Sequence, residues 1–390
     1  NLEILDSFAY KNISNIKNHI PNSNLTIKEE VETSIIFKKL QSKLKELNRM
    51  DFDDILYYYY ELISSNDFYL ESIQDYFQYV LIDEAQDINL DTEEVWGEGV
   101  TFDKEDVWDR SNTTSFLEVY DLATGDIRTL ATFEKVIEAP NWSHNGKFLV
   151  YNSEGHVYKY DLESGESTLI KTEGLCTINN DHVLSSDDTR ISVSDETSED
   201  HKSRIYTVGI EDGIVELITP EAPSYLHGIT LDDKTYCYCA ERGGEYDVYA
   251  RDKDGQEVRL TTAPGLNDGC EYDSNGEYIY FNSVRTGLMQ AWRMKADGSC
   301  QEQLTSDTKF NTWFPHISPD GKKIVMISYY KGDLWPGDHV PNKMVELRLM
   351  NSDGSDLKTI VKMFGGQGTI NVNSWSPDSS KFAYVRYKKN

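Results

Sequence analysis

The sequence predicts a mainly β protein: a six-bladed β-propeller that follows a small N-terminal α-helical segment. Three observations support this fold class. A turn motif of the Ser-Pro-Asp-Gly type occurs in six versions within residues 116–390, and a second hairpin motif also occurs six times there. Helical periodicity, by contrast, is confined to the first part of the chain. An internal repeat of about 40 to 58 residues is typical of repeat folds such as propellers.

Composition narrows the class of protein further. With 38% hydrophobic and 12% aromatic residues, the 390-residue chain can build a real core and could hold two or three domains. Its formal charge of -29 argues against a nucleic-acid or anionic-membrane surface. No apolar run approaches the roughly 20 residues of a membrane helix, and no secretory signal is evident. The five cysteines are odd in number and lack zinc-ligand spacing. We therefore expect a reduced, cytoplasmic monomer with no membrane or nucleic-acid partner for the propeller.

Residues 1–92 are predicted to form the helical segment. Apolar side chains recur there at helical spacing, at Ile36, Leu40, Leu44 and Leu47. A later apolar run, Tyr79–Ile82, ends in Asp83 and Glu84. An apolar strand that delivers Asp-Glu at its carboxyl end suits nucleotide hydrolysis, because the Asp can hold magnesium and the Glu can orient the attacking water.

Two stretches of this segment, Met50–Leu56 and Tyr79–Asn89, resemble the superfamily 1 DNA helicases of the UvrD, PcrA and Rep type. The second stretch is similar to their Walker B motif. The resemblance implies a magnesium residue in Asp83, a catalytic carboxylate in Glu84 and a nucleotide-sensing contact in Gln86. No Gly-x-x-x-x-Gly-Lys-Ser/Thr loop occurs in the 390 residues, however. We therefore interpret the segment as the remnant of an ATP-dependent DNA helicase, and we expect neither bound ATP nor ATPase activity.

Residues 93–115 are predicted to be an acidic linker. The stretches Asp91–Gly99 and Asp103–Asp106 are acidic and show no clear period, and Ser111–Ser115 is polar. Composition changes across this region from helix formers to β formers. The sequence thus predicts a domain boundary here, with the propeller occupying residues 116–390.

One half of each propeller repeat is a strand–turn–strand unit. Its clearest copy, Ser318–Gly321, suits a type I turn, because Pro presets φ at the second position and Gly is favoured at the fourth. A β-branched, apolar run follows it, as a strand requires. The six copies are Trp142–Lys147, Leu184–Asp188, Ile229–Asp233, Tyr272–Gly276, Ile317–Gly321 and Trp375–Ser379.

The other half of the repeat is a hairpin. Its six turns are Ala123–Gly125, Glu163–Gly165, Glu211–Gly213, Lys253–Gly255, Ala296–Gly298 and Ser352–Gly354. Asp-Gly between alternating apolar strands is a strong hairpin signal. Two such halves give four strands per blade and six blades. The region opens with a lone hairpin, Phe116–Ala131, and closes with a lone strand pair, Val372–Tyr387, so we expect its two ends to complete one blade together.

The Ser-Pro-Asp-Gly-Lys signature, without Trp-Asp strand ends, resembles the TolB-like (PD40) propellers and not true WD40 repeats. The resemblance runs over essentially all of residues 116–390. Four stretches look like a signal-less bacterial branch of this family: Asn179–His182, Pro223–His227, Trp313–His316 and Gly365–Asn371. It implies a protein that works through contacts with a ligand or with a protein partner.

Three histidines lie at similar positions on the predicted inner strands. His182 and His227 lie three residues before the first turn position, and His316 lies two before it. Equivalent positions of different blades converge on the propeller axis, so we expect the three imidazoles to meet there. Neutral imidazoles suit one divalent ion of manganese, zinc or iron, and Gln367 could add an oxygen ligand.

Other polar and aromatic residues near this mouth are candidates for ligand contacts: Asn180, Asp181, Tyr225, Trp313 and Asn373. Aromatic rings there can stack on a sugar. The arrangement distantly resembles oligogalacturonate lyases, propellers with a metal bound by His and Gln. Arg242 and Arg285 lie in corresponding outer loops of the predicted propeller and could bind a substrate carboxylate bidentately. Two functions remain open: a propeller that binds a saccharide or a protein at its histidine-lined mouth, and a metal-dependent polysaccharide or oligosaccharide lyase.

Overall fold

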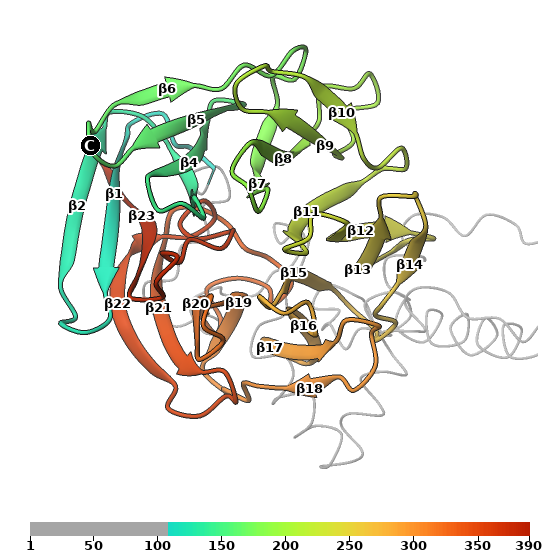
Figure 1. Cartoon of the computed structure of the whole chain (residues 1–390). Helices are drawn as coiled ribbons and strands as arrows, with labels where there is room; N and C mark the ends of the chain where they lie inside the picture. The colour runs from blue at the N-terminus through green and yellow to red at the C-terminus, as the bar shows by residue number, and fades with distance from the viewer. Residues whose placement is uncertain (1–107) are drawn as a thin grey trace, which may run out of the picture. The chain divides into compact units, whose positions relative to one another are not determined.

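The computed structural model describes residues 108–390 (Figure 1). These residues form 23 β-strands and no helix, which confirms the mainly β class. No helix capable of crossing a bilayer occurs in this part of the chain. The predicted N-terminal helical segment, with Asp83, Glu84 and Gln86, lies outside the described residues.

Five blades are four-stranded antiparallel sheets. From the innermost strand outward, the first blade consists of β3 (Glu138–Trp142), β4 (Phe148–Ser153), β5 (His156–Asp161) and β6 (Ser167–Leu169). The second blade consists of β7 (Ile178–Leu184), β8 (Arg190–Asp195), β9 (Arg204–Gly209) and β10 (Val215–Leu217). The third blade consists of β11 (Ser224–Ile229), β12 (Thr235–Arg242), β13 (Glu245–Asp252) and β14 (Glu257–Arg259). The fourth blade consists of β15 (Asn267–Tyr272), β16 (Tyr278–Thr286), β17 (Leu288–Lys295) and β18 (Glu302–Gln303). The fifth blade consists of β19 (Phe310–Ile317), β20 (Lys323–Tyr330), β21 (Lys343–Asn351) and β22 (Lys358–Gly365). Figure 1 shows the inner strands around the centre and β6, β10, β14 and β18 on the outside.

The sixth blade is built from both ends of the propeller and closes the ring. Its sheet runs β2 (Ile127–Phe133), β1 (Thr113–Asp121) and β23 (Lys381–Lys389). Strands β1 and β23 pair along their whole length, and its inner strand is reduced to an isolated bridge between Trp375 and Phe382. The prediction of six blades with a shared closing blade is confirmed. Closure packs the sixth blade between the fifth and the first, since β23 contacts both β22 and β3.

The predicted type I turn is present between β19 and β20. The Gly321 amide donates to the Ser318 carbonyl at 2.8 Å, and the Ser318 hydroxyl accepts from the Lys323 amide at 3.0 Å. In the second and third blades, which lack the Pro-Asp-Gly sequence, Asp188 and Asp233 adopt left-handed φ values of 58° and 56°. Asp tolerates this conformation better than most residues. The turn geometry has therefore survived the loss of its usual sequence.

Each inner strand of the first five blades contains a register shift against its neighbour. Such bulges bend a strand and re-aim its side chains. Ala139, Gly269 and Phe314 occupy equivalent places in three blades and have φ values of 52°, 60° and 55°. A left-handed φ is unusual for a side chain as bulky as phenylalanine. These bulges set the direction of the polar side chains next to the propeller axis.

Candidate functional site

The inner strand of the fourth blade, β15, supplies carboxylates to histidines of both neighbouring blades. His227 Nε2, on β11, lies 2.8 Å from Asp268 Oδ1. His316 Nδ1, on β19, lies 2.6 Å from Glu271 Oε2. The register shift of β15 falls between Asp268 and Glu271. The two carboxylates can therefore serve histidines on both sides of the strand.

Gly269 makes this bulge possible. Its φ of 60° lies in the left-handed region, and a Cβ at this position would come 2.1 Å from Asn282 Oδ1. Any side chain would force either the Asn282 amide or the β15 backbone to move. The glycine is therefore required for the placement of Asp268 and Glu271.

His227 and Asp268 form a buried ion pair, with exposed fractions of 6% and 7%. Burial disfavours the charged imidazole, but the Asp268 carboxylate outweighs this effect and raises the pKa of His227. Burial likewise opposes the charged carboxyl, but His227 holds the pKa of Asp268 well below its usual range. The Nδ1 atom of His227 is buried and has no hydrogen-bond partner among residues 108–390. Because the two ring nitrogens diverge, this atom faces away from Asp268 and offers an unused N–H.

Asp181, on β7, is a second buried acid of this region and is 6% exposed. Burial raises the pKa of Asp181 to about 7; the Asp268 and Glu138 carboxylates add to the shift, while His227 and the Asn179 side chain oppose it. Its carboxyl group can therefore both give and accept a hydrogen near neutral pH. A buried acid with such a pKa beside a specific charge partner is typical of a functional site.

His339 completes the group from the segment between β20 and β21. Its Nε2 lies 4.0 Å from Asp268 Oδ2, and its ring packs edge-on against Trp313 with 4.4 Å between centroids. Burial lowers the pKa of His339, and Asp268 opposes this shift. We call Asp181, His227, Asp268 and His339 the channel-mouth cluster.

Tyr225 and Tyr246 border this cluster. Their ring centroids are 6.4 Å apart, and Tyr246 is 36% exposed. Burial raises the pKa of Tyr225, with further contributions from Tyr246 and Asp181. The phenol of Tyr225 therefore remains protonated and can act as a hydrogen-bond donor. Tyr225 thus lies close to Asp181, which the sequence also placed among the ligand-contacting residues.

The predicted metal ligands have different surroundings. His316 uses both ring nitrogens, since Nδ1 contacts Glu271 and Nε2 lies 2.9 Å from the Ile370 carbonyl. His182 is fully buried with both nitrogens unpaired, and burial lowers its pKa to about 3. Gln367 has a buried Oε1 without a partner. No group of three or more His, Cys, Asp or Glu side chains that could hold a metal occurs within residues 108–390. The residues present do not fit the predicted metal.

The remaining predicted ligand contacts are engaged in internal interactions. Asn373 Nδ2 donates to Glu271 Oε1 at 2.5 Å and to the Ile317 carbonyl at 2.9 Å. Asn180 donates to Glu138 Oε1 at 3.5 Å and accepts from Asn371 Nδ2 at 3.3 Å. Trp313 is fully buried, so neither face of its indole is open to a sugar ring.

The two arginines predicted to bind a substrate carboxylate are also engaged. All five N–H donors of Arg242 reach internal acceptors: both oxygens of Glu257, the Ser224 hydroxyl, and the Pro223 and Glu241 carbonyls. Arg285 donates to Ser283, Gln301 and Asn267, and its guanidinium lies 4.6 Å above the Trp292 ring. In this conformation Arg242 has no donor left for a ligand.

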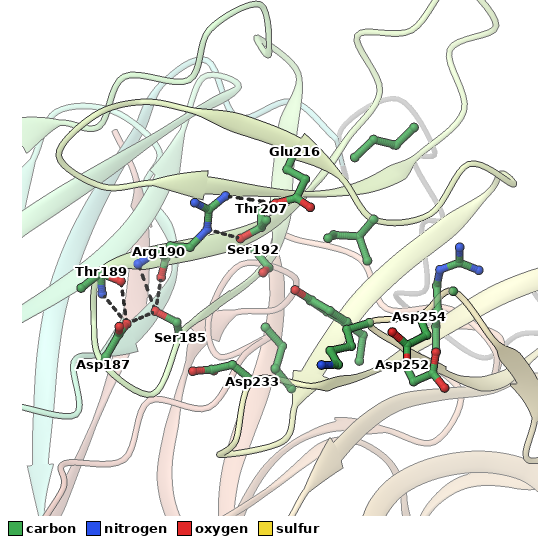
Figure 2. A pocket seen from close by; sticks show the side chains of 17 residues that line it. Ser185, Asp187, Thr189, Arg190, Ser192, Thr207, Glu216, Asp233, Asp252 and Asp254 are labelled. Atoms are coloured by element: carbon green, nitrogen blue, oxygen red, sulfur yellow. Dashed lines mark hydrogen bonds and ion pairs between the residues drawn. The ribbon is translucent and has the colours of Figure 1, made fainter.

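A shallow groove of about 450 Å³ lies between the second and third blades (Figure 2). Arg190 donates to the Thr207 hydroxyl at 3.3 Å, and Asp187 accepts from Ser185 and Thr189. Arg190 also lies 3.7 Å from Glu216. The groove is open, its acids outnumber its bases, and most of its polar groups are paired with one another. It is therefore a weaker candidate than the channel-mouth cluster.

Sequence reasoning missed Glu138, Asp268, Glu271 and His339. A signal for two of them was available, because Glu138 and Asp268 occupy the same place before their turns as Asn180 and Tyr225 do before theirs. His339 was not detectable in this way. It belongs to the segment between β20 and β21, which has no counterpart in the repeat.

Two of the proteins to which the chain is similar match about 70% of its length. A curated relative, "Uncharacterized protein Atu1656" of Agrobacterium fabrum, is 43% identical over 275 residues, which is 70% of this chain and 92% of the relative. A solved structure, "putative TolB from Agrobacterium tumefaciens", is 41% identical, with a TM-score of 0.68, and the match covers 71% of this chain and 99% of that one. An oligogalacturonate lyase in complex with manganese matches at 14% identity and a TM-score of 0.43, over 65% of this chain and 74% of that one, and this likeness is too distant to bear on chemistry.

The N-terminal segment has different relatives. The family model for the UvrD/REP helicase N-terminal domain matches residues 4–96. A "Putative ATP-dependent DNA helicase YjcD" of Bacillus subtilis is 37% identical over 73 residues. That match covers 18% of this chain and only 10% of the helicase. The resemblance to UvrD-type helicases is thus confirmed for this segment.

Proposed function

This chain belongs to the TolB-like family of six-bladed β-propellers, and we propose that it binds a ligand, a saccharide or a protein partner, at the mouth of its central channel. The contacts would come from the channel-mouth cluster and from the neighbouring Tyr225. Asn180 would not touch the ligand itself; through its hydrogen bond to Glu138 it would help to position that carboxylate near Asp181.

One observation carries this proposal: the buried, unused Nδ1 of His227. A buried polar atom without a partner costs roughly 1–3 kcal/mol, so such atoms are rare and need an explanation. His227 is held in place by Asp268 at 2.8 Å, so its free nitrogen has a fixed direction. The nitrogen is covered by protein atoms, so a ligand that accepts from it must first displace neighbouring side chains, and the new hydrogen bond then removes the cost.

Thermal unfolding of the full chain in the presence of saccharide and peptide libraries tests the proposal. A ligand that prefers the folded state raises the Tm, because it stabilises that state by RT ln(1 + [L]/Kd), where [L] is the free ligand concentration. We expect at least one compound to raise the Tm of the wild type and to fail with both His227→Phe and Asp181→Asn. Arg293→Gln, on the third strand of the fourth blade where Arg293 pairs with Glu302 of β18, is the matched control and should keep the effect. Compounds that act equally on all four proteins would contradict the site.

The metal-dependent lyase considered from the sequence receives no support from the side chains. His316 would have to give up hydrogen bonds to Glu271 and Ile370 before it could bind a metal. Arg242 would have to release Glu257 before it could bind a uronate. We therefore derive no reaction step through a metal.

The helicase-like segment adds no activity to this proposal. Asp83, Glu84 and Gln86 fall within the matched residues 4–96, but the phosphate-binding loop is missing from the sequence. The absence of ATP binding and the division into residues 1–92, 93–115 and 116–390 stay predictions. Isothermal titration of the full chain with MgATP measures the first directly.

A further inference from the structure

We infer that Asn275, in the turn between β15 and β16, is a site of spontaneous deamidation in the folded protein. The reaction needs no ligand, so it is independent of the proposed binding function. Asn-Gly is the dipeptide at which deamidation is easiest, because glycine has no Cβ to obstruct its main-chain nitrogen. The chain contains two such dipeptides, at Asn145 and at Asn275, at the same place in the turns of the first and fourth blades. Both asparagines are exposed, but their hydrogen bonds differ.

A hydroxyl group at the first position of the turn holds the third residue in five of the six turns. The hydroxyl donates to Oδ1 of the third residue in the pairs Ser143–Asn145 (3.1 Å), Ser185–Asp187 (2.7 Å), Thr230–Asp232 (2.7 Å), Ser318–Asp320 (2.8 Å) and Ser376–Asp378 (2.6 Å). In the fourth blade the first position is Asp273, whose carboxylate accepts from the amides of Glu277 and Tyr278 at 2.8 and 3.1 Å. The Asn275 side chain therefore has no hydrogen-bond partner within residues 108–390.

The turn of the next blade holds Asn145 a second time. Asp188, the fourth residue of the turn in the second blade, accepts from the main-chain amide of Asn145 at 2.8 Å. Similar contacts between neighbouring turns run from the Ser186 amide to Asp233 at 2.9 Å and from the Asp320 amide to the Ser379 hydroxyl at 3.0 Å. The residue that corresponds to Asp188 for the fourth blade is Gly321, which has no side chain to accept from the Asn275 amide.

The hydrogen bonds of the two glycines do not distinguish the sites. The Gly146 amide donates to the Ser143 carbonyl at 3.0 Å, and the Gly276 amide donates to the Asp273 carbonyl at the same distance. The Asn145 side chain, by contrast, also accepts from the Lys147 amide at 2.9 Å. The difference between the sites therefore lies in the asparagines, and only Asn275 is free to turn its amide carbon toward the next main-chain nitrogen.

The reaction changes both the charge and the main chain of the turn. The Gly276 nitrogen attacks Cγ of Asn275 and forms a five-membered succinimide ring. The proton of the Gly276 N–H leaves with the side-chain nitrogen as ammonia. One water then opens the ring: cleavage at Cγ yields aspartate, and cleavage at the main-chain carbonyl yields isoaspartate. Either product adds one negative charge. Aspartate is also the third residue of four other turns, whereas isoaspartate lengthens the main chain by one methylene group.

The test is incubation of the full chain in mildly alkaline buffer, followed by peptide mapping with mass spectrometry and detection of isoaspartate with an isoaspartate methyltransferase. We expect Asn275 to deamidate at least about tenfold faster than Asn145, because several hydrogen bonds of Asn145 must break before its side chain can react. In concentrated urea the two sites should react at similar rates, since the unfolded chain keeps none of these contacts.

Two variants give Asn275 the contacts that Asn145 has. Asp273→Ser introduces the hydroxyl group at the first turn position. Gly321→Asp introduces the acceptor from the next blade, at a left-handed φ of 70° that Asp tolerates and with nothing within 4 Å of the new Cβ. Each variant should slow deamidation of Asn275 by about threefold or more and leave the rate at Asn145 unchanged.

Equal rates at Asn275 and Asn145 in the folded chain would overturn the inference. So would an unreactive Asn275 in the folded chain under conditions in which the chain in urea reacts at both sites. Rates at Asn275 that stay the same in Asp273→Ser and Gly321→Asp would show that the missing hydrogen bonds are not the cause of its reactivity.

Discussion

His227 of the third blade and Asp268 of the fourth form a buried ion pair, with 2.8 Å between Nε2 and Oδ1. Two charges can be taken out of water only if they stay paired and hydrogen-bonded. This pair lies beside Asp181, whose charge influences both partners. Loss of either partner should therefore lower the free energy of unfolding and change the pKa of Asp181.

Asp268→Asn removes the counter-charge of a buried imidazole. We expect it to lower the free energy of unfolding by roughly 3–5 kcal/mol, since an uncompensated buried charge is left behind. Urea denaturation at pH 6 measures this. The matched control is Glu302→Gln, which breaks an ion pair of 2.7 Å to Arg293 in which Glu302 is 58% exposed. That control should cost less than about 1 kcal/mol; equal losses in the two variants would refute the buried pair.

Gly269→Ala should disturb both histidines of the neighbouring blades. The new Cβ meets Asn282 Oδ1 at 2.1 Å in a backbone with φ of 60°. We expect a loss of about 1–3 kcal/mol or more, because strain and a clash add together. Gly276→Ala is the control, since its φ is 68° and nothing lies within 4 Å of the added atom. Histidine ring spectra measured by NMR should shift for His227 and His316 only in the first variant; unchanged spectra would show that β15 tolerates the side chain.

His182 should make stability fall in acid. Its pKa is about 3 in the folded protein against an ordinary 6.5, so the unfolded chain takes up the proton first. The stability that depends on neutral His182 is present above pH 6.5 and is lost as the pH falls toward 3. The slope is about 1.4 kcal/mol per pH unit. Relative to wild type, His182→Leu should remove this slope in urea titrations between pH 4 and 6.5. The partly exposed His156→Leu should leave it, and an identical slope in both variants would contradict the burial of His182.

Asp181 should act in the opposite direction. Its folded pKa of about 7 exceeds the ordinary 3.8, so its contribution is full below pH 3.8 and is lost as the pH rises through 7. Asp181→Asn should therefore become more stable than wild type as the pH increases, by about 1.4 kcal/mol per unit between pH 4 and 7. In the wild type this slope offsets that of His182. A pH-independent difference between Asp181→Asn and wild type would show that the carboxyl is not protonated in the fold.

The ring itself could be predicted from the sequence because its signals are local. Ser318–Gly321 specifies a turn, and Ser352–Gly354 specifies a hairpin, without reference to any distant residue. The number of such turns predicts the number of blades. The incomplete strand pairs at the two ends of the repeat region predict that β1 and β23 close the ring together. Turn chemistry of this kind depends on φ preferences that each residue carries with it.

The side-chain directions at the axis could not be predicted in the same way. His182, His227 and His316 lie at similar repeat positions, but a register shift in each inner strand turns them into different surroundings. His227 pairs with Asp268 and His316 pairs with Glu271, whereas the ring nitrogens of His182 have no partner within residues 108–390. The partners come from another blade, so no spacing within one repeat could reveal them. His339 comes from an inserted segment and lies outside the repeat altogether.

The pairing of β1 with β23 in the sixth blade, which joins the two ends of the propeller, makes the ring suitable for circular permutation. The Asn390 amide donates to the Asn112 carbonyl at 2.9 Å, so the first and last residues of the ring are neighbours. A short peptide joining them, with new ends opened at an exposed hairpin such as Ser164, would yield the same six blades in a rotated order. Such a permutant would carry its chain ends at a hairpin of another blade, without any substitution of the channel-mouth residues.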